Sequence, residues 1–244
     1  MLHGVGSSAD TWRRLLPYLH TGTIIAPDYR GHGYSDSPEP PYCLEDFVCD
    51  IRRLLDELEI ERIDVLGFSI GALFAAKLAL NHPSCVKSLI LLNSIADRTP
   101  EQKIRARERL EFLSTHLPDE TAPATAVRWF TPAFLESHDD LVEAEAGITV
   151  STPHAPYASS YRVLVENDLI DEVSGISCPT LIMTGELDEG STPAMSEALH
   201  RQIPGSLLRI IGGVKHYMHF ERPEELARHV NEFLKQADTA AVEM

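Results

Sequence analysis

A serine between two glycines, in the order Gly67-Phe68-Ser69-Ile70-Gly71, is the first candidate for chemistry in this chain. The apolar run 63–66 before it predicts a buried strand, and the apolar run 72–80 after it predicts a buried helix that ends before Pro83. On so tight a turn the serine must adopt a strained backbone conformation, and the glycines let the strand and the helix approach closely. This strand–turn–helix context predicts a nucleophilic serine hydroxyl.

A nucleophilic serine needs a general base, and the base needs a carboxylate that orients it. Asp188 follows a predicted strand over 179–184, and His216 follows the last predicted strand, 207–211. Because the carboxyl ends of parallel strands meet at one edge of a sheet, both side chains should lie near Ser69. The sequence therefore predicts a catalytic Ser69–His216–Asp188 triad that attacks a carbonyl and forms an acyl-enzyme, which water then releases.

Other titratable residues compete for the roles of base and acid. They are His219 for the base, and Glu186, Glu189 and Asp97 for the acid. Glu186 and Glu189 are typical of a solvated turn, and Asp97 lies several residues beyond the end of its strand, 86–92. Asp188 is therefore the stronger candidate for the orienting carboxylate, while the choice of base between His216 and His219 needs a further signal.

The rest of the chain alternates strands with helices. Further strands are expected at 23–26 and 86–92, and helices at 44–58, from Pro193 onward, and from about 223 to 234. Helices between successive strands predict an α/β fold with a mostly parallel sheet that carries helices on both faces.

One long stretch, 98–172, contains helical segments and no convincing strand. An insertion of this size between two sheet strands predicts a helical cap over the active site, and the alternative is a structural appendage. The expected domains are a first core part at 1–97, the cap at 98–172, and a second core part at 173–244.

Composition indicates a globular enzyme, with 43% hydrophobic and 24% charged residues and a net charge of −16. This acidity argues against nucleic acid or an anionic membrane as a partner. We find no apolar run long enough to span a membrane and no signal-peptide pattern, so we expect a cytoplasmic protein. Cys43, Cys49, Cys85 and Cys178 lack metal-ligand spacing and are expected to be buried fillers. The expected partner is a small-molecule substrate, with no metal or organic cofactor, and the oligomeric state stays open.

Four short motifs, in order along the chain, resemble those of the α/β-hydrolase superfamily. They are His3-Gly4, the D-x-R-G-x-G-x-S pattern at 28–35, the Gly67–Gly71 turn, and the H-x4-E-x-P pattern at 216–223. The resemblance implies the α/β-hydrolase fold and selects His216 as the base, because its spacing to Glu221 and Pro223 fits the last motif. The backbone N–H groups of Val5 and Ile70 are then the expected donors of the oxyanion hole.

Two further segments resemble 3-oxoadipate enol-lactonases, namely residues 93–96 and the cap sequence at 128–131. That resemblance implies a small lactone with a free carboxylate, for which Arg128 would be the anchor. The candidate substrate-binding residues are Arg128, Trp129, Tyr157 and Tyr161. Phe130, Phe134 and Arg162 are further candidates, and each aromatic residue could instead pack in the cap core. Ala72 and Lys215 depart from the glycines that relatives commonly carry there.

Three other activities stay open at this point. Carbon–carbon bond hydrolases of aromatic ring-fission products resemble ester hydrolases of this superfamily in their triad. Some members serve as non-catalytic small-molecule receptors, and a cofactor-free oxidative activity is a further alternative.

The beginning of the chain departs most from the superfamily. Relatives have a β-hairpin and a strand before the His-Gly loop, whereas only Met1 and Leu2 precede His3 here. We therefore expect an N-terminally shortened chain that lacks a strand of about five or six residues between 23–26 and the strand before Ser69. Unpaired backbone groups should then leave the chain poorly soluble or nearly inactive.

Overall fold

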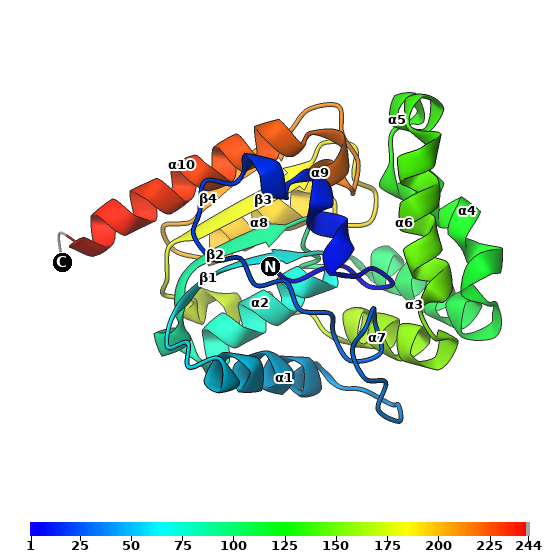
Figure 1. Ribbon diagram of the computed structural model, residues 1–244, viewed down its shortest axis with the longest axis horizontal. Coiled ribbons are helices and arrows are strands. Elements are labelled where there is room, and N and C mark those ends of the chain that lie inside the picture. Colours follow the sequence, from blue (N-terminus) through cyan, green and yellow to red (C-terminus); the bar gives the residue numbers. More distant parts are fainter. Residues whose placement is uncertain (243–244) are drawn as a thin grey trace.

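Four parallel strands form the central sheet of the computed structural model, which describes residues 1–242 (Figure 1). In spatial order they are β1 (Ile63–Phe68), β2 (Val86–Leu92), β3 (Thr180–Gly185) and β4 (Leu207–Ile211). The predicted bounds of β2 and β4 are correct, and those of β1 and β3 differ by one or two residues. The predicted parallel sheet is confirmed.

Successive strand residues point to opposite faces of the sheet, and each face has its own apolar core. In β2, Leu89 and Leu91 belong to one core, whereas Ile90 and Leu92 belong to the other. The first core is covered by α1 (Leu44–Glu57), α2 (Ile70–Asn81) and α8 (Pro193–Gln202). The second is covered by the 3-10 helix η1 (Ala9–Arg14), α9 (Met218–Glu221) and α10 (Pro223–Val242). Helices on both faces are therefore confirmed, and α10 is longer than expected.

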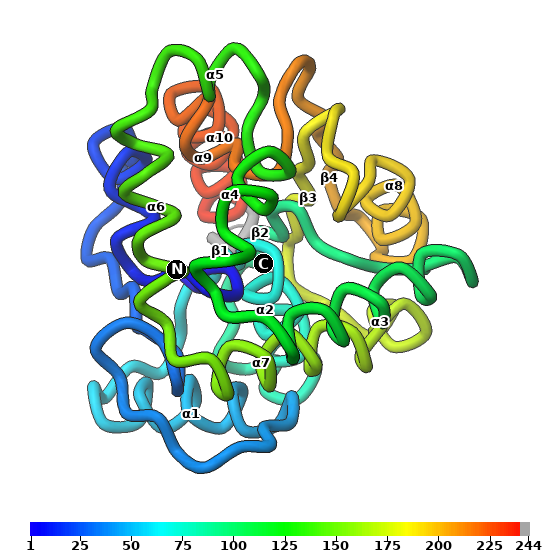
Figure 2. The backbone as a smooth tube through the Cα atoms, turned by 90° about the vertical axis from the view of Figure 1, so that its right-hand side faces the viewer, coloured from blue at the N-terminus to red at the C-terminus, as the bar shows by residue number. Residues whose placement is uncertain are grey.

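Residues 98–172 carry five α-helices and no strand. They are α3 (Pro100–Thr115), α4 (Pro118–Trp129), α5 (Pro132–Ser137), α6 (Asp139–Ser151) and α7 (His154–Glu166). These helices gather at one end of the sheet in Figure 1 and lie in front of it in Figure 2. Within the group, α3 packs on α7 and α4 packs on α6. The helical character of this stretch is as expected, and its division from the core as a domain stays a prediction.

The strand expected at 23–26 does not form in the structure. A strand needs a neighbour that accepts and donates along its length, and within residues 1–242 no strand pairs with this segment. The Met1 amino group donates to the Ile25 carbonyl at 2.5 Å, and Leu2 makes an isolated parallel bridge to Gly67. A cavity of about 320 Å³ lies between this segment and β1. The additional strand expected between this segment and β1 stays a prediction.

The cysteines differ from the expectation of buried fillers. Cys43 and Cys49 are exposed because they fall on the solvent side at the start of α1, whereas Cys85 is buried and Cys178 is half-buried. All four are free thiols in the structure.

Within residues 1–242, no helix combines the length and the apolar character needed to cross a bilayer.

The turn at Ser69 depends on two glycines that sit against backbone atoms. A Cβ atom on Gly67 would overlap the Gly71 carbonyl group, and a Cβ atom on Gly71 would overlap the carbonyl oxygens of Leu2 and His3. These contacts confirm the predicted close approach of strand and helix.

We expect Gly71→Ala to lower the free energy of unfolding by about 3 kcal/mol, because the new methyl group displaces packed backbone. Gly147→Ala is the matched control, since Gly147 lies in α6 with open space around it. That control should raise the free energy of unfolding by roughly 0.5–1 kcal/mol through helix propensity. Urea unfolding of both variants measures the difference, and an unchanged midpoint for Gly71→Ala would contradict the close approach.

Candidate active site

Ser69 lies directly between β1 and α2, with φ 56° and ψ −117°. A positive φ is uncommon for serine, so the predicted backbone strain is confirmed. The Ser69 N–H donates to the Leu92 carbonyl at 2.9 Å and the Phe68 N–H donates to the Leu2 carbonyl at 2.9 Å. These bonds hold the strained residue on both sides.

Asp188 and His216 are in direct contact, with 2.6 Å between Oδ2 and Nδ1. The Asp188 carboxylate is buried, and its Oδ1 accepts the N–H groups of Gly190 at 2.9 Å and Ser191 at 3.0 Å. Because Nδ1–H of His216 donates to Asp188, Nε2 of His216 is the nitrogen that can take a proton.

Asn93 also binds this carboxylate, a role that the sequence analysis missed. Its Nδ2–H donates to Asp188 Oδ2 at 2.7 Å from the carboxyl end of β2, where Asn93 has φ 49°. Burial by itself raises the pKa of Asp188, but His216 and the bonds from Ser191 and Asn93 outweigh it and hold the pKa below its usual value. The sequence signal was an asparagine, which tolerates positive φ, directly after a strand.

Ser69, Asp188 and His216 line one cavity of about 1,010 Å³ between the strand ends and the cap. Within residues 1–242, neither the Ser69 hydroxyl nor His216 Nε2 makes a hydrogen bond. Catalytic hydrogen bonds are often long in the absence of substrate and tighten in the complex. The arrangement can therefore support nucleophilic attack, and the three catalytic roles stay predictions.

Two of the four rival residues, His219 and Asp97, lie outside the cavity lining. Glu186 and Glu189 line the cavity, but His216 bonds Asp188, and Glu186 instead accepts the Gly213 N–H at 3.0 Å. His219 is fully buried outside the cavity lining, and its Nε2 is 2.9 Å from Thr11 Oγ1. Asp97 is exposed, and its N–H donates to Asp168 rather than contacting His216. Burial lowers the pKa of His219 well below its ordinary value, which keeps this ring neutral. The geometry thus favours His216 as the base.

The two expected oxyanion donors flank Ser69. Ile70 begins α2, and Val5 belongs to the loop over residues 3–7, here called the oxyanion loop. A Cβ atom on Gly4 would lie 3.7 Å from Ser69 Cβ, so this loop passes beside the nucleophile. In the described part of the chain, neither the Val5 nor the Ile70 N–H donates a hydrogen bond. Both are free to bind a negative oxygen.

His3 fixes the first part of the oxyanion loop. The Tyr29 N–H donates to His3 Nε2 at 3.2 Å, so the ring proton is on Nδ1, which donates to the Gly4 carbonyl at 2.7 Å. The Gly4 carbonyl also accepts the Ser7 N–H at 3.3 Å.

His32 fixes the middle of the same loop. The Gly6 N–H donates to His32 Nε2 at 3.0 Å, so the ring proton lies on Nδ1, 3.2 Å from the Arg30 carbonyl. Burial lowers the pKa of His32 to about 4, which keeps the ring neutral and Nε2 able to accept. His32, which lies within the D-x-R-G-x-G-x-S pattern at 28–35, thus positions the loop beside Ser69.

All four candidate substrate-binding residues, Arg128, Trp129, Tyr157 and Tyr161, line the cavity. Trp129 stacks on Tyr217, next to His216, with ring centroids 4.5 Å apart. Phe130 and Phe134 are instead buried in the apolar core, and Arg162 is exposed outside the cavity lining. Phe130 and Phe134 therefore pack in an apolar core instead of lining the substrate cavity.

Arg109 of α3 is a further cavity residue that the sequence analysis missed. Its guanidinium donates to Thr125 Oγ1 at 2.6 Å, and burial together with the nearby Arg128 lowers the pKa of Arg109. Among residues 1–242, neither Arg109 nor Arg128 forms an ion pair with a carboxylate. Two uncompensated cations in one cavity can bind an anionic group. A helical arginine carries no sequence signal that separates this position from an exposed one.

The segment from Lys215 to Glu221, which includes His216, is bonded to the cap at three residues, one of which is Tyr217, whose N–H donates to the Trp129 carbonyl at 3.0 Å. Lys215 Nζ donates to the Val127 carbonyl at 2.9 Å, which gives this departure from glycine a structural role. Glu221 accepts the Thr131 N–H at 2.9 Å and the Thr131 hydroxyl at 2.6 Å. The glutamate of the last motif thus anchors the chain where α4 leads into α5.

Buried neutral His32 should make the fold sensitive to acid. Its pKa is about 4 in the folded state against 6.5 ordinarily, so between these values the unfolded chain binds more protons. The free energy of unfolding should therefore fall, by up to roughly 3 kcal/mol, as the pH drops through this window. His32→Gln can still accept the Gly6 N–H and does not titrate, so its unfolding free energy should fall less steeply.

Urea unfolding between about pH 4 and pH 7 measures these slopes. Exposed His20 provides the matched control, His20→Gln, which should keep the wild-type slope. Equal slopes for the wild type and His32→Gln would show that His32 is not the group that titrates.

Comparison with known proteins accords with this geometry. The 3-oxoadipate enol-lactonase 2 of Acinetobacter baylyi is 29% identical over 96% of this chain and 87% of its own length. The 2-hydroxymuconate semialdehyde hydrolase of a Pseudomonas species is 27% identical over 99% of this chain and 88% of its own. The crystal structure of the enol-lactonase from Burkholderia xenovorans superposes with a TM-score of 0.86 at 28% identity, covering 96% of this chain and 89% of that one. A family model described as alpha/beta hydrolase fold matches residues 1–223, so the chain belongs to the α/β-hydrolase family.

Proposed function

We propose that this α/β hydrolase cleaves a small ester or lactone through an acyl-enzyme on Ser69. The observation that carries the proposal is the bonded Asp188–His216 pair, which opens on the same cavity as a strained serine. The N–H groups of Val5 and Ile70 beside that serine, which donate no hydrogen bond within residues 1–242, support the same chemistry.

The proposed reaction begins when Ser69 Oγ attacks the carbonyl carbon and His216 Nε2 takes its proton. Asp188 holds the imidazole tautomer and stabilises the imidazolium that forms. The N–H groups of Val5 and Ile70 donate to the oxyanion of the tetrahedral intermediate. His216 returns the proton to the leaving oxygen, and a water activated by the same nitrogen then releases the acid from Ser69.

The substrate is proposed to carry a free carboxylate. Support comes from Arg109 and Arg128, which line the cavity without a carboxylate partner in the described chain. Arg128 extends toward the loop after β3, since a Cβ atom on Gly190 would lie 3.7 Å from its Nη2. The enol-lactonase names of two similar proteins accord with a lactone.

Carbon–carbon bond hydrolysis is the second candidate. The relative named 2-hydroxymuconate semialdehyde hydrolase favours it, because its similarity covers 99% of this chain. A panel of small esters, carboxylated lactones and ring-fission products, assayed with the purified protein, tests the two candidates together. Turnover of the ring-fission products alone would favour the second.

Ser69→Ala should reduce kcat on the order of a million-fold, because the acyl acceptor is lost. His216→Gln should cost a similar factor, since the substituted amide cannot act as a base. His219→Gln is the matched control, because an amide can still donate to Thr11, and it should stay within about tenfold of the wild type. Initial rates on p-nitrophenyl acetate measure all three, and a larger loss for His219→Gln than for His216→Gln would reverse the assignment.

Arg128→Gln and Arg109→Gln should each lower kcat/KM for a carboxylated lactone while sparing a neutral short ester. Loss of one charge-assisted hydrogen bond costs about 1.5–3 kcal/mol, or roughly ten- to a hundredfold. Arg107→Gln is the control, since Arg107 is exposed on the same helix as Arg109 and outside the cavity lining. Equal losses on both substrates would mean that the two arginines are structural.

A further inference from the structure

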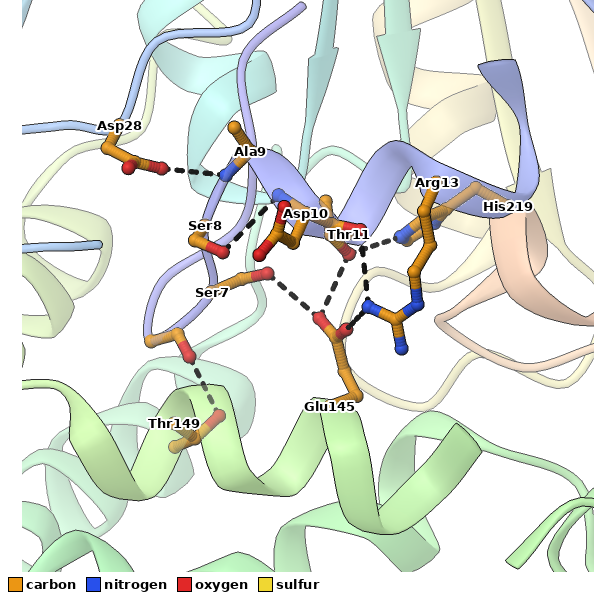
Figure 3. Close-up of polar contacts among 11 residues, drawn as sticks. Ser7, Ser8, Ala9, Asp10, Thr11, Arg13, Asp28, Glu145, Thr149 and His219 are labelled. Atoms are coloured by element: carbon orange, nitrogen blue, oxygen red, sulfur yellow. Dashed lines mark hydrogen bonds and ion pairs between the residues drawn. The ribbon is translucent and has the colours of Figure 1, made fainter. Parts of the chain in front are cut away.

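Glu145 of cap helix α6 is a carboxylate whose side chain is completely buried. Its Oε1 accepts the hydroxyl protons of Ser7 and Thr11, each at 2.9 Å, and its Oε2 lies 3.4 Å from Arg13 Nη1 (Figure 3). Buried carboxylates are rare unless they are paired, because desolvation of the charge is costly. Three donors from residues 7–13 partly compensate this charge, although burial still raises the pKa of Glu145. The cap and the first residues of the chain therefore meet at Glu145.

The same cap helix contacts the oxyanion loop a second time, one helical turn further on. Thr149 Oγ1–H donates to the Gly6 carbonyl at 2.7 Å (Figure 3). The spacing of four residues puts Glu145 and Thr149 on one face of α6, against consecutive residues of the loop. Helix α6 thus binds Gly6 through its backbone and Ser7 through its side chain.

These contacts bear on the orientation of the Val5 N–H, together with the bond from His3 Nδ1 to the Gly4 carbonyl at 2.7 Å. The Gly4 carbonyl and the Val5 N–H belong to one trans peptide group and therefore point in opposite directions. The Gly4 carbonyl is turned toward Ser7, whose N–H it accepts at 3.3 Å, and Ser7 is held through its hydroxyl by Glu145. Because the Gly4 carbonyl is hydrogen-bonded on the side of Ser7, the Val5 N–H points the other way. Val5 lines the cavity, and its N–H donates no hydrogen bond within residues 1–242.

Thr11 shows why an acceptor is needed at position 145. Its one hydroxyl proton goes to Glu145, so the same oxygen must accept Nε2–H from His219. An apolar side chain in place of Glu145 would leave the buried hydroxyls of Ser7 and Thr11 without an acceptor.

We propose that Glu145 is a positioning residue for the oxyanion hole. Through Ser7, the docked cap helix α6 holds the Gly4–Val5 peptide in the orientation that presents the Val5 N–H to the substrate oxygen. This inference rests on the proposed function, in which Val5 is an oxyanion donor. The cap then has a catalytic consequence besides enclosing the substrate.

Glu145→Leu is the direct test, with p-nitrophenyl acetate as the substrate, because leucine removes the acceptor of the Ser7 and Thr11 hydroxyls. The loss of an oxyanion donor lowers kcat by about a hundred- to a thousandfold, and a misoriented donor should cost at least about tenfold. The KM should change by less than about threefold, because the contact strengthens only in the transition state. Glu143→Leu, at an exposed position on the same helix, is the matched control and should keep the wild-type kcat.

Ser7→Ala removes the link between Glu145 and the loop and leaves Arg13 and Thr11 on the carboxylate. It should reproduce the loss in kcat, and the double variant Ser7→Ala/Glu145→Leu should lose little more than the larger single loss, because both changes break one chain of contacts. If Glu145→Leu unfolds, Ser7→Ala alone decides.

The outcomes separate the two proposals. A folded wild-type protein that turns over no member of the ester, lactone and ring-fission panel would contradict the proposed function. An active wild type with an unchanged kcat in Glu145→Leu or Ser7→Ala, or with a loss confined to KM, would overturn the role of Glu145.

Discussion

The close contact of three backbone segments at Gly71 is the constraint on which the site depends. The carbonyl groups of Leu2 and His3 pack where any side chain on Gly71 would lie, so the oxyanion loop and the first turn of α2 are in contact. Ser69 sits on this contact in a strained conformation, which persists because hydrogen bonds from its own N–H and that of Phe68 over-determine it. The nucleophile and the loop beside it are therefore placed by one packing arrangement, and neither can shift without the other.

Electrostatics act on two length scales in this molecule. The net charge of −16 opposes the approach of anions from a distance, but charges beyond about 8 Å are largely screened at physiological ionic strength. Inside the cavity, Arg109 and Arg128 have no ion-pair partner among the described residues, and their charges act at short range on whatever enters. Asp188 is compensated separately, by His216, Asn93 and two backbone N–H groups. The cavity therefore joins a compensated acid–base pair to two arginines that form no ion pair among the described residues, although Glu101, Glu186 and Glu189 also line it. This distribution supports the proposed carboxylated substrate.

Features that depend on local sequence were predictable, and features that depend on distant neighbours were not. The turn at Ser69 and the strands β2 and β4 follow from glycine spacing and apolar runs, and the positions of Asp188 and His216 follow from where strands end. The segment 23–26 has the composition of a strand but lacks the neighbour that would make it one. The contact of Asn93 with Asp188 exists because β2 and β3 are adjacent, and strand order is not written in local sequence. Glu145 reads as one acidic residue among several in α6, and only the docking of the cap onto residues 7–13 distinguishes it.

The oxyanion loop shows how one short segment can be held by the whole fold. Its Gly4 carbonyl is bound by His3 and Ser7, its Gly6 N–H by His32 from the core, and its Gly6 carbonyl by Thr149 from the cap. Each peptide group with a partner is fixed by a different part of the chain. The Val5 N–H beside the nucleophile has no acceptor among residues 1–242. Such preorganisation is what electrostatic catalysis requires, because a donor that is already oriented needs no reorganisation during the reaction. Cap helix α6 is here bonded to the loop that would stabilise the transition state, so under the proposed mechanism a change at this contact acts on the rate.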